Sequence, residues 1–176
     1  MPTADGYAPM RILLLCHGLP PESVGGVEQH VEGLAQALAA SGNQVHVFAR
    51  TSAANFPQGA LLPTEGSNPA ITRCVYRWEG LTGLEDSYVC APMAATLRTF
   101  LAERAAAGEV FDVAHVHHLT GMSTDALREL RQAGIPVVLT LHDYWLMCPR
   151  GQMWHPHEVV CDRVEPNRCG ECLHLT

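Results

Sequence analysis

The sequence predicts a doubly wound, Rossmann-like α/β fold, in which helices cover both faces of a mostly parallel β-sheet. Short apolar runs that are typical of strands buried on both faces alternate along the chain with segments of helical periodicity. Residues 11–50 read as strand, helix and strand, which is the βαβ unit of a parallel sheet with a right-handed crossover. The last thirty or so residues show neither the helical nor the strand period of apolar residues, and there we expect an irregular, Cys-rich segment.

The first βαβ unit is the clearest part of the pattern. The apolar run RILLLCH predicts a strand over Arg11–His17, and it is followed by Gly18, Pro20 and Pro21. A helix is predicted over Val27–Ala40, where apolar residues recur at helical spacing and Gly42 gives a stop signal. The run QVHVFAR then predicts a second strand over Gln44–Arg50.

The rest of the sheet follows the same alternation. Residues 51–70 are rich in Pro, Gly, Ser and Asn and are predicted to form a surface loop, as are residues 79–89. The remaining predicted strands are Ile71–Trp78, Asp112–His117 and Pro136–His142, and the remaining predicted helices are Pro92–Ala107 and Ser123–Ala133.

Charge and composition exclude several classes of function. The formal net charge is −7, and the eleven cationic residues are all arginines scattered along the chain, which disfavours nucleic acid as a partner and leaves no polybasic membrane patch. The absence of lysine excludes a Walker-type phosphate site and a Schiff base. Residues 1–10 lack the features of a signal peptide, so we expect a disordered N-terminus and a cytoplasmic protein.

Three blocks of sequence resemble the N-terminal domain of retaining glycosyltransferases of family 4, which have the GT-B fold. These blocks are LPPESVGGVEQHVEGLAQALAASGNQVHVFAR, DVAHVHHLTGMS and IPVVLTLHDYWLMCPRGQ. The resemblance implies that residues 11–146 form a Rossmann-like, acceptor-side domain and that the donor-binding C-terminal domain lies outside this sequence. It also implies a nucleotide-sugar donor, no metal in catalysis, and a sugar, lipid-linked or small-molecule acceptor. Any peripheral association with a membrane would belong to parts outside this segment.

The pair Gly25-Gly26 precedes the first predicted helix, at the edge of the sheet where open α/β folds bind ligands. On spacing alone, a turn that tightens the strand–helix connection is a better interpretation of the two glycines than a phosphate-binding loop. The resemblance implies that this loop meets the diphosphate of the donor. Glu28 and His30, in the first helical turn, are candidate acceptor contacts or part of a solvated helix face, and His142, Asp143 and Arg150 are further acceptor candidates.

Among the ten histidines, His115, His117 and His118 lie along and just after one predicted strand. We expect His115 to be satisfied in the core, with its side chain pointing away from that of His117. The resemblance implies a cleft histidine after such a strand, so His117 is the predicted catalytic residue, with the adjacent His118 as the alternative. Its role would be to orient donor and acceptor, since the leaving phosphate itself can accept the proton in retaining transfer.

Residues 147–176 contain Cys148, Cys161, Cys169 and Cys172, spaced C-x12-C-x7-C-x2-C. Four thiolates with one C-x2-C pair suit a structural zinc ion. An iron–sulfur cluster or loose reduced thiols are the alternatives, and His155 or His157 could replace one cysteine ligand. Cys16, Cys74 and Cys90 are predicted to be small core residues.

Two other functions remain open on sequence alone. A nicotinamide-binding Rossmann domain is disfavoured because GGVE departs from G-x-G-x-x-G and because the second strand ends in Arg50 rather than an acidic residue. The other is a non-enzymatic, zinc-dependent binding module.

Overall fold

The computed structural model describes residues 8–64, 68–80, 82–155 and 159–173. The chain divides into two compact units, Met1–Thr140 (unit 1) and Leu141–Thr176 (unit 2), and each is described by itself. The division falls after Thr140, whereas the predicted Rossmann-like part ends after Leu146. Most of the N-terminal segment predicted to be disordered lies outside the described residues.

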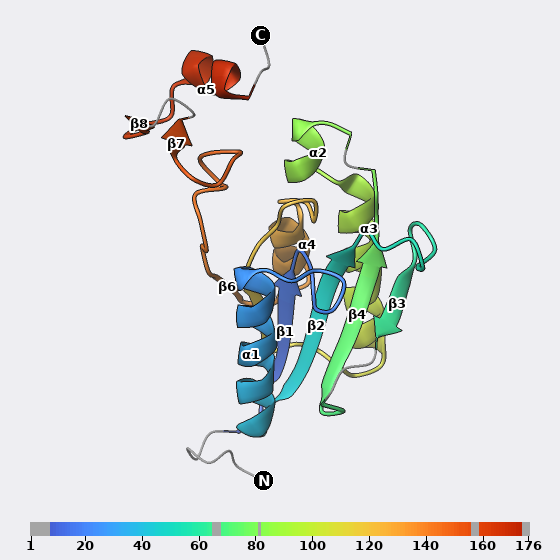
Figure 1. Ribbon diagram of the computed structural model, residues 1–176. Helices are drawn as coiled ribbons and strands as arrows, with labels where there is room; N and C mark the ends of the chain where they lie inside the picture. The colour runs from blue at the N-terminus through green and yellow to red at the C-terminus, as the bar shows by residue number, and fades with distance from the viewer. Residues whose placement is uncertain (1–7, 65–67, 81, 156–158, 174–176) are drawn as a thin grey trace. The chain divides into compact units, whose positions relative to one another are not determined.

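Unit 1 is built on a six-stranded sheet in the order β3-β4-β2-β1-β5-β6 (Figure 1). All neighbouring strands are parallel except β3 and β4, which are antiparallel. The prediction of a mostly parallel sheet is therefore confirmed. The strands are β1 (Arg11–Cys16), β2 (Gln44–Thr51), β3 (Leu61–Thr64), β4 (Ile71–Arg77), β5 (Val113–Val116) and β6 (Val137–Leu139).

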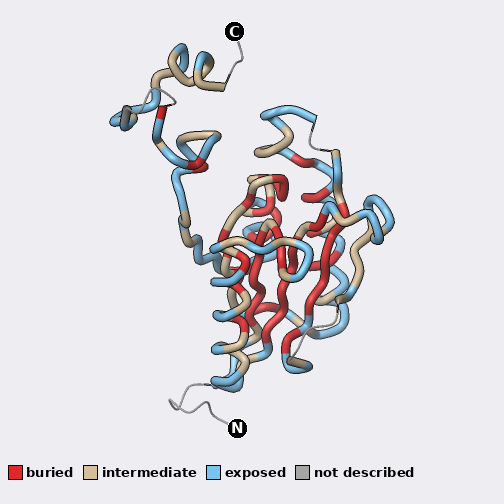
Figure 2. Tube along the Cα trace, viewed as in Figure 1, coloured by how far each residue is buried: buried red, intermediate tan, exposed pale blue. Residues whose placement is uncertain are grey.

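The helices cover both faces of this sheet. Helix α1 (Gly26–Ala40) lies on one face, and α3 (Ala91–Ala106) and α4 (Ala126–Gln132) lie on the other (Figure 1). On the α1 face, Ile12, Leu14 and Cys16 pack with Val31 and Ala35 of the helix. On the opposite face, Phe48 of β2 contacts Phe100 of α3, with ring centroids 5.3 Å apart. Figure 2 shows the central strands buried between these layers, so the doubly wound arrangement is confirmed.

Unit 1 departs from the predicted elements in its loops and at its ends. Strand β3 and the short helix α2 (Leu84–Tyr88) fall in segments predicted as loops. Strand β3 carries Pro63 and pairs on one side only, which is where a sheet tolerates proline. Helix α4 begins later than predicted because Ser123 has a positive φ of 75°. Strand β6 ends at Leu139, before His142, and its three residues are exposed.

Unit 2 has more regular structure than predicted. A pair of two-residue antiparallel strands, β7 (Trp154–His155) and β8 (Val159–Val160), precedes a helix of about two turns, α5 (Pro166–Cys172). The prediction of a segment without a helix was therefore wrong. Periodicity gives no signal in so short a helix, although Pro166 lies in its first turn, where proline is favoured. Among the described residues of both units, every helix is too short or too polar to span a bilayer.

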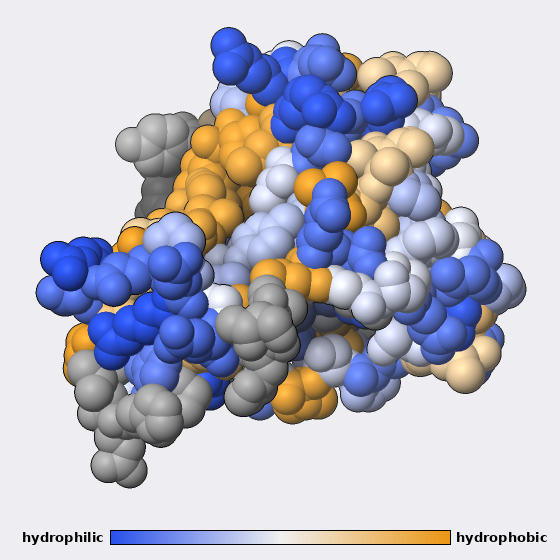
Figure 3. Space-filling model, turned by 90° about the horizontal axis from the view of Figure 1, so that it is seen from above, coloured by the Kyte–Doolittle hydropathy of each residue, from blue (hydrophilic) through white to orange (hydrophobic). Residues whose placement is uncertain are grey.

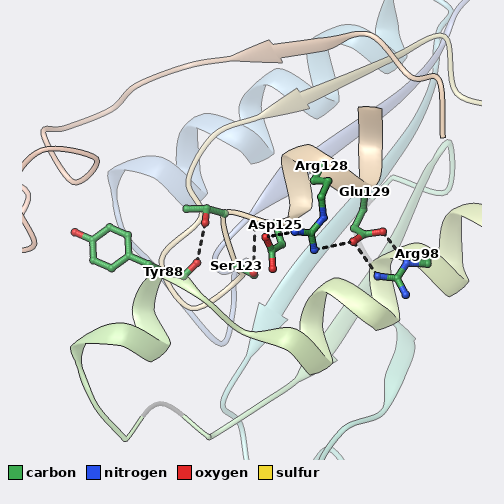
Figure 4. A network of polar contacts seen from close by, with 7 residues as sticks. Tyr88, Arg98, Ser123, Asp125, Arg128 and Glu129 are labelled. Carbon is green, nitrogen blue, oxygen red and sulfur yellow. Dashed lines mark hydrogen bonds and ion pairs between the residues drawn. The ribbon is translucent and has the colours of Figure 1, made fainter. Parts of the chain in front are cut away.

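One buried carboxylate connects the two helices on the far face of the sheet (Figure 4). Glu129 of α4 is only 2% exposed and accepts hydrogen bonds from Arg98 Nε and Nη2 of α3 at 2.7 and 2.9 Å. The Arg98 guanidinium holds the pKa of Glu129 below its usual range. In the same region, Thr124 N donates to the Tyr88 carbonyl at 2.7 Å, which connects α2 to the loop before α4.

We expect Glu129→Gln to lower the free energy of unfolding by about 1–2 kcal/mol, because it removes the charge from a buried, doubly hydrogen-bonded carboxylate. Glu109→Gln is the matched control, since Glu109 forms its ion pair with Arg104 at a half-exposed site, where such pairs contribute less than about 1 kcal/mol. Urea denaturation of both variants measures the difference. Equal losses in the free energy of unfolding would show that the buried Arg98–Glu129 pair stabilises the fold no more than the half-exposed pair does.

Candidate functional site

The candidate site lies where β1 and β5 adjoin, at the carboxyl ends of these strands. From β1 the chain adds β2 and β4 on one side, then returns to add β5 and β6 on the other. In doubly wound folds this reversal opens the ligand-binding crevice. His17 directly follows β1, and His117 directly follows β5, with its backbone N–H donating to the Leu15 carbonyl at 3.0 Å. The surface viewed from above shows both hydrophilic and hydrophobic groups (Figure 3).

Helix α1 points its N-terminus at this edge. Its N-cap residue is Gly25, which makes no side-chain capping bond. The N–H groups of the first helical turn have no intrahelical acceptors, and the helix dipole adds partial positive charge there. Such an N-terminus favours a phosphate group, provided that the backbone is accessible.

The Glu28 carboxylate organises the loop between β1 and α1. It is 4% exposed, accepts a hydrogen bond from Ser23 Oγ at 2.6 Å, and lies 3.3 Å from His17 Nε2. Burial alone would raise the pKa of Glu28, but the Ser23 hydroxyl and the nearby His17 and His118 rings outweigh it and keep that pKa below its usual range. In this structure Glu28 positions the loop. The alternative of a solvated helix face is wrong for Glu28 because the residue is buried, and its role as an acceptor contact stays a prediction.

The two glycines of the pair differ in what surrounds them. A Cβ at Gly25 would lie 2.6 Å from Glu28 Oε2, whereas a Cβ at Gly26 would meet nothing within 4 Å. Gly18 is similarly crowded, since a Cβ there would lie 2.7 Å from the Ser23 Cβ. A side chain at position 25 would therefore displace the Glu28 carboxylate from its place in the loop. Gly26 leaves open space in front of the helix N-terminus.

The histidines after β5 gather into a compact group. His117 is 1% exposed, and its ring centroid lies 4.0 Å from that of His115 and 5.4 Å from that of the exposed His30. The expectation that His115 and His117 point apart was wrong, because residues two apart on an extended chain share a face. His115 is half-buried, and its Nε2 lies 2.7 Å from Thr140 Oγ1.

Sequence reasoning missed His17 as a site residue. Its ring lies 4.7 Å from that of His118, and its Nε2 contacts Glu28. The signal was available, because His17 follows a buried strand in the same way as His117 does. His117 and His118 therefore belong to two different clusters, one with His30 and His115 and the other with His17 and Glu28.

The other predicted site residues lie in unit 2. Asp143 Oδ1 accepts a hydrogen bond from the backbone N–H of Trp145 at 2.8 Å, and Arg150 Nη1 donates to Cys172 Sγ at 3.4 Å. His142 is half-buried. Their roles as acceptor contacts, like all the predicted site roles, stay predictions. His157 lies outside the described residues.

The seven cysteines separate into two kinds, and all are free thiols. Burial raises the pKa of Cys16 to about 11 and that of Cys74 to about 12, and it also raises the pKa of Cys90. These three are core residues, as predicted. Burial alone would raise the pKa of Cys148 too, but backbone N–H groups of Met153, Gln152, Arg150 and Gly151 outweigh it and lower that pKa.

Comparison with known proteins gives one family and a group of distant structures. The family model for Glycosyltransferase Family 4 matches residues 24–165. No curated protein sequence matches the chain. Trehalose-6-phosphate synthase from E. coli, bound with UDP-2-fluoro glucose, is similar over 76% of this chain and 33% of its own, with 13% identity and a TM-score of 0.43.

Another trehalose-6-phosphate synthase structure gives 18% identity and a TM-score of 0.45 over 76% of this chain and 34% of its own. The enzyme from Burkholderia multivorans gives 13% identity and a TM-score of 0.44 over 76% and 32%. The chain thus spans about a third of the length of these solved structures.

We expect Gly25→Ala to destabilise unit 1 by about 1–2 kcal/mol, because the new methyl group displaces the Glu28 carboxylate from its partners. Gly26→Ala and the control Gly33→Ala, whose Cβ atoms meet nothing within 4 Å, should instead stabilise α1 slightly, by up to about 1 kcal/mol. Chemical denaturation measures all three.

The folded state lowers the Glu28 pKa, so the contribution of Glu28 is present near neutral pH and is lost as the pH falls through the folded pKa. The deficit of Gly25→Ala should therefore narrow on acidification. A deficit that is independent of pH, or equal in Gly26→Ala, would contradict the assignment to Glu28.

Proposed function

The chain belongs to glycosyltransferase family 4, and from this premise we propose that it is the acceptor-side domain of a retaining, nucleotide-sugar-dependent glycosyltransferase of the GT-B type. The observation that carries this proposal is that an open helix N-terminus at Gly26 and the buried His117 lie at the same switch point of the sheet, where the His30 ring of α1 adjoins that of His117. The first suits an anion, and the second supplies a preorganised hydrogen-bonding group.

The N-terminus of α1 would bind the diphosphate of the donor. Its first-turn N–H groups can donate to phosphate oxygens, and Gly26 lets those oxygens approach the backbone. The Glu28 carboxylate lies on the Gly25 side, beside His17. The rest of the nucleotide sugar would be bound by a second domain outside this sequence.

His117 would orient the reacting groups by hydrogen bonds. In retaining transfer the new glycosidic bond forms on the face from which the diphosphate leaves, so a leaving phosphate oxygen can take the proton of the acceptor hydroxyl. Hence no strong base is required of the protein, and a histidine held rigidly by its neighbours suffices. Contact with His115 and burial restrict the His117 ring in this way.

The acceptor would approach from the exposed side of His30, whose ring adjoins that of His117. A sugar, lipid-linked or small-molecule hydroxyl compound fits this role. His142, Asp143 and Arg150 are proposed as further acceptor contacts, and Arg150 is a donor that suits an acidic or hydroxyl-rich acceptor.

A nicotinamide cofactor has less support. Strand β2 ends in Arg50 and Thr51, where dinucleotide-binding domains place an acidic residue on the ribose hydroxyl. Titration with dinucleotides should therefore show no saturable binding, and saturable binding would favour the oxidoreductase alternative.

We expect residues 1–176 assayed alone to transfer no sugar from any nucleotide sugar. The proposed donor site has only one wall in this chain, so the leaving diphosphate would lack most of its binding groups. A coupled assay that detects the release of nucleoside diphosphate measures this. Measurable turnover by the purified chain would overturn the assignment to an acceptor-side domain.

In the complete enzyme, we expect His117→Ala to lower kcat by about 10²–10³, the usual cost of losing one preorganised contact to the transition state. His46→Ala is the matched control, because His46 is also buried on the sheet but lies at the third residue of β2, away from its carboxyl end. It should lower the melting temperature and leave kcat unchanged.

His118→Ala separates the two histidine clusters. Full activity in His117→Ala with loss in His118→Ala would move the role to the cluster with His17 and Glu28. Full activity in both variants would remove the catalytic role from these histidines altogether.

A further inference from the structure

Unit 2 cannot be ordered by apolar burial. Among its described residues, only Trp145, Gly151 and His155 are buried. Its strands have two residues each, and α5 buries none of its side chains. Ordering costs about 1–2 kcal/mol per residue, and chains below about 40 residues usually require a cross-link or a metal. Some covalent or coordinate bond must therefore offset the entropy lost by this segment.

Four cysteines of unit 2 line one cavity of about 30 Å³. They come from separate parts of the unit: Cys148 from a turn, Cys161 from the end of β8, and Cys169 and Cys172 from α5. Residues three apart on a helix share a face, so the α5 pair directs both sulfurs to the same side. Elements far apart in the sequence thus bring all four cysteines to the wall of one partly open cavity.

The Cys148 turn is built rigidly around its sulfur. The backbone N–H of Cys148 donates to the Tyr144 carbonyl at 2.7 Å, and that of Gly151 donates to the Cys148 carbonyl at 2.7 Å. Gly151 adopts a positive φ of 74°, which favours glycine. This conformation holds Cys148 in a fixed turn on the wall of the cavity.

Positive charge surrounds the same cavity. Arg150 Nη1 donates to Cys172 Sγ at 3.4 Å, and Arg163 and Arg168 also line the cavity. Glu165 is the one acidic residue among the lining residues, and Arg163 forms an ion pair with it at 2.6 Å. Neighbouring arginines stabilise thiolates, and a complex of a divalent ion with four thiolates carries two negative charges that they would offset.

We propose that Cys148, Cys161, Cys169 and Cys172 bind one zinc ion in a closed, tetrahedral site that orders unit 2. Binding forms four Zn–S bonds; each thiol that is still protonated releases its proton to water, and nothing is oxidised or reduced. With four protein ligands the ion keeps no open position, so its role is structural. This inference is independent of the proposed function.

The thiols must move closer together to bind one ion. In the part of the chain that the structure describes, no three of these four sulfur atoms all lie within 4.8 Å of one another. Zn–S bonds of about 2.3 Å place the sulfurs closer than that. Rotation of the side chains around the cavity is therefore part of metal binding, and ordering of unit 2 is coupled to it.

The test uses the whole chain, purified without chelator and without a metal-affinity column. Elemental analysis should give about one zinc per chain, and the double variant Cys169→Ser, Cys172→Ser should lose it. Cys90→Ala is the control, because Cys90 is a buried thiol of unit 1, and it should keep the metal. Cooperative unfolding of the double variant would show that its sheet still folds.

Cobalt substitution then counts the ligands, since sulfur-to-cobalt charge-transfer absorbance rises with the number of thiolates. We expect four thiolates, and we expect His155→Ala to keep the metal while Cys161→Ser weakens it. The reverse pair of results would overturn the four-cysteine set. Metal-free protein with four reactive thiols, iron with sulfide, or disulfides found by mass spectrometry under non-reducing conditions would each overturn the zinc site.

Discussion

The position of β1 determines most of what this domain does. The strand pairs in parallel with β2 on one side and β5 on the other, and it is buried on both faces. A strand enclosed on four sides has one register, so its carboxyl end is placed precisely. His17 follows it directly, and the hydrogen bond from His117 N to Leu15 O sets the second histidine against the same strand. The sheet, rather than the loops, therefore fixes the positions of His17 and His117 in the candidate site.

Glu28 transfers this rigidity to the loop that meets α1. Its carboxylate is bonded to Ser23, lies beside His17, and packs against Gly25. A buried carboxylate at a helix N-terminus is favoured by the dipole, but it also occupies part of the space in which an anion would bind. The loop resolves this competition by geometry, because Glu28 lies against Gly25 and the space in front of Gly26 is open.

The sequence predicted the parallel strands and their helices because each has a buried, periodic pattern. Strand β3 was not predicted because Pro63 argues against a strand. Helix α2 was not predicted because five residues are too few to show a helical period. His117 was predicted as a site residue because it lies at the carboxyl end of its strand, and His17 lies at the end of β1 in the same way. Pattern alone could not separate Gly25 from Gly26, since their difference depends on where the Glu28 side chain lies. Nor could it show that four cysteines line one cavity.

The pairing of β1 with β5 also affects how the domain is made. Ile12 pairs with Val113, so β1 leaves the ribosome before β5 and completes its hydrogen bonding only after β5 has been synthesised. At about 5–20 residues per second, one side of β1 waits on the order of 5–20 s for its partner. During that interval an apolar strand has exposed N–H and C=O groups, which is a template for wrong pairing. The same strand that gives the finished site its precision is therefore exposed to wrong pairing while the rest of the domain is being made.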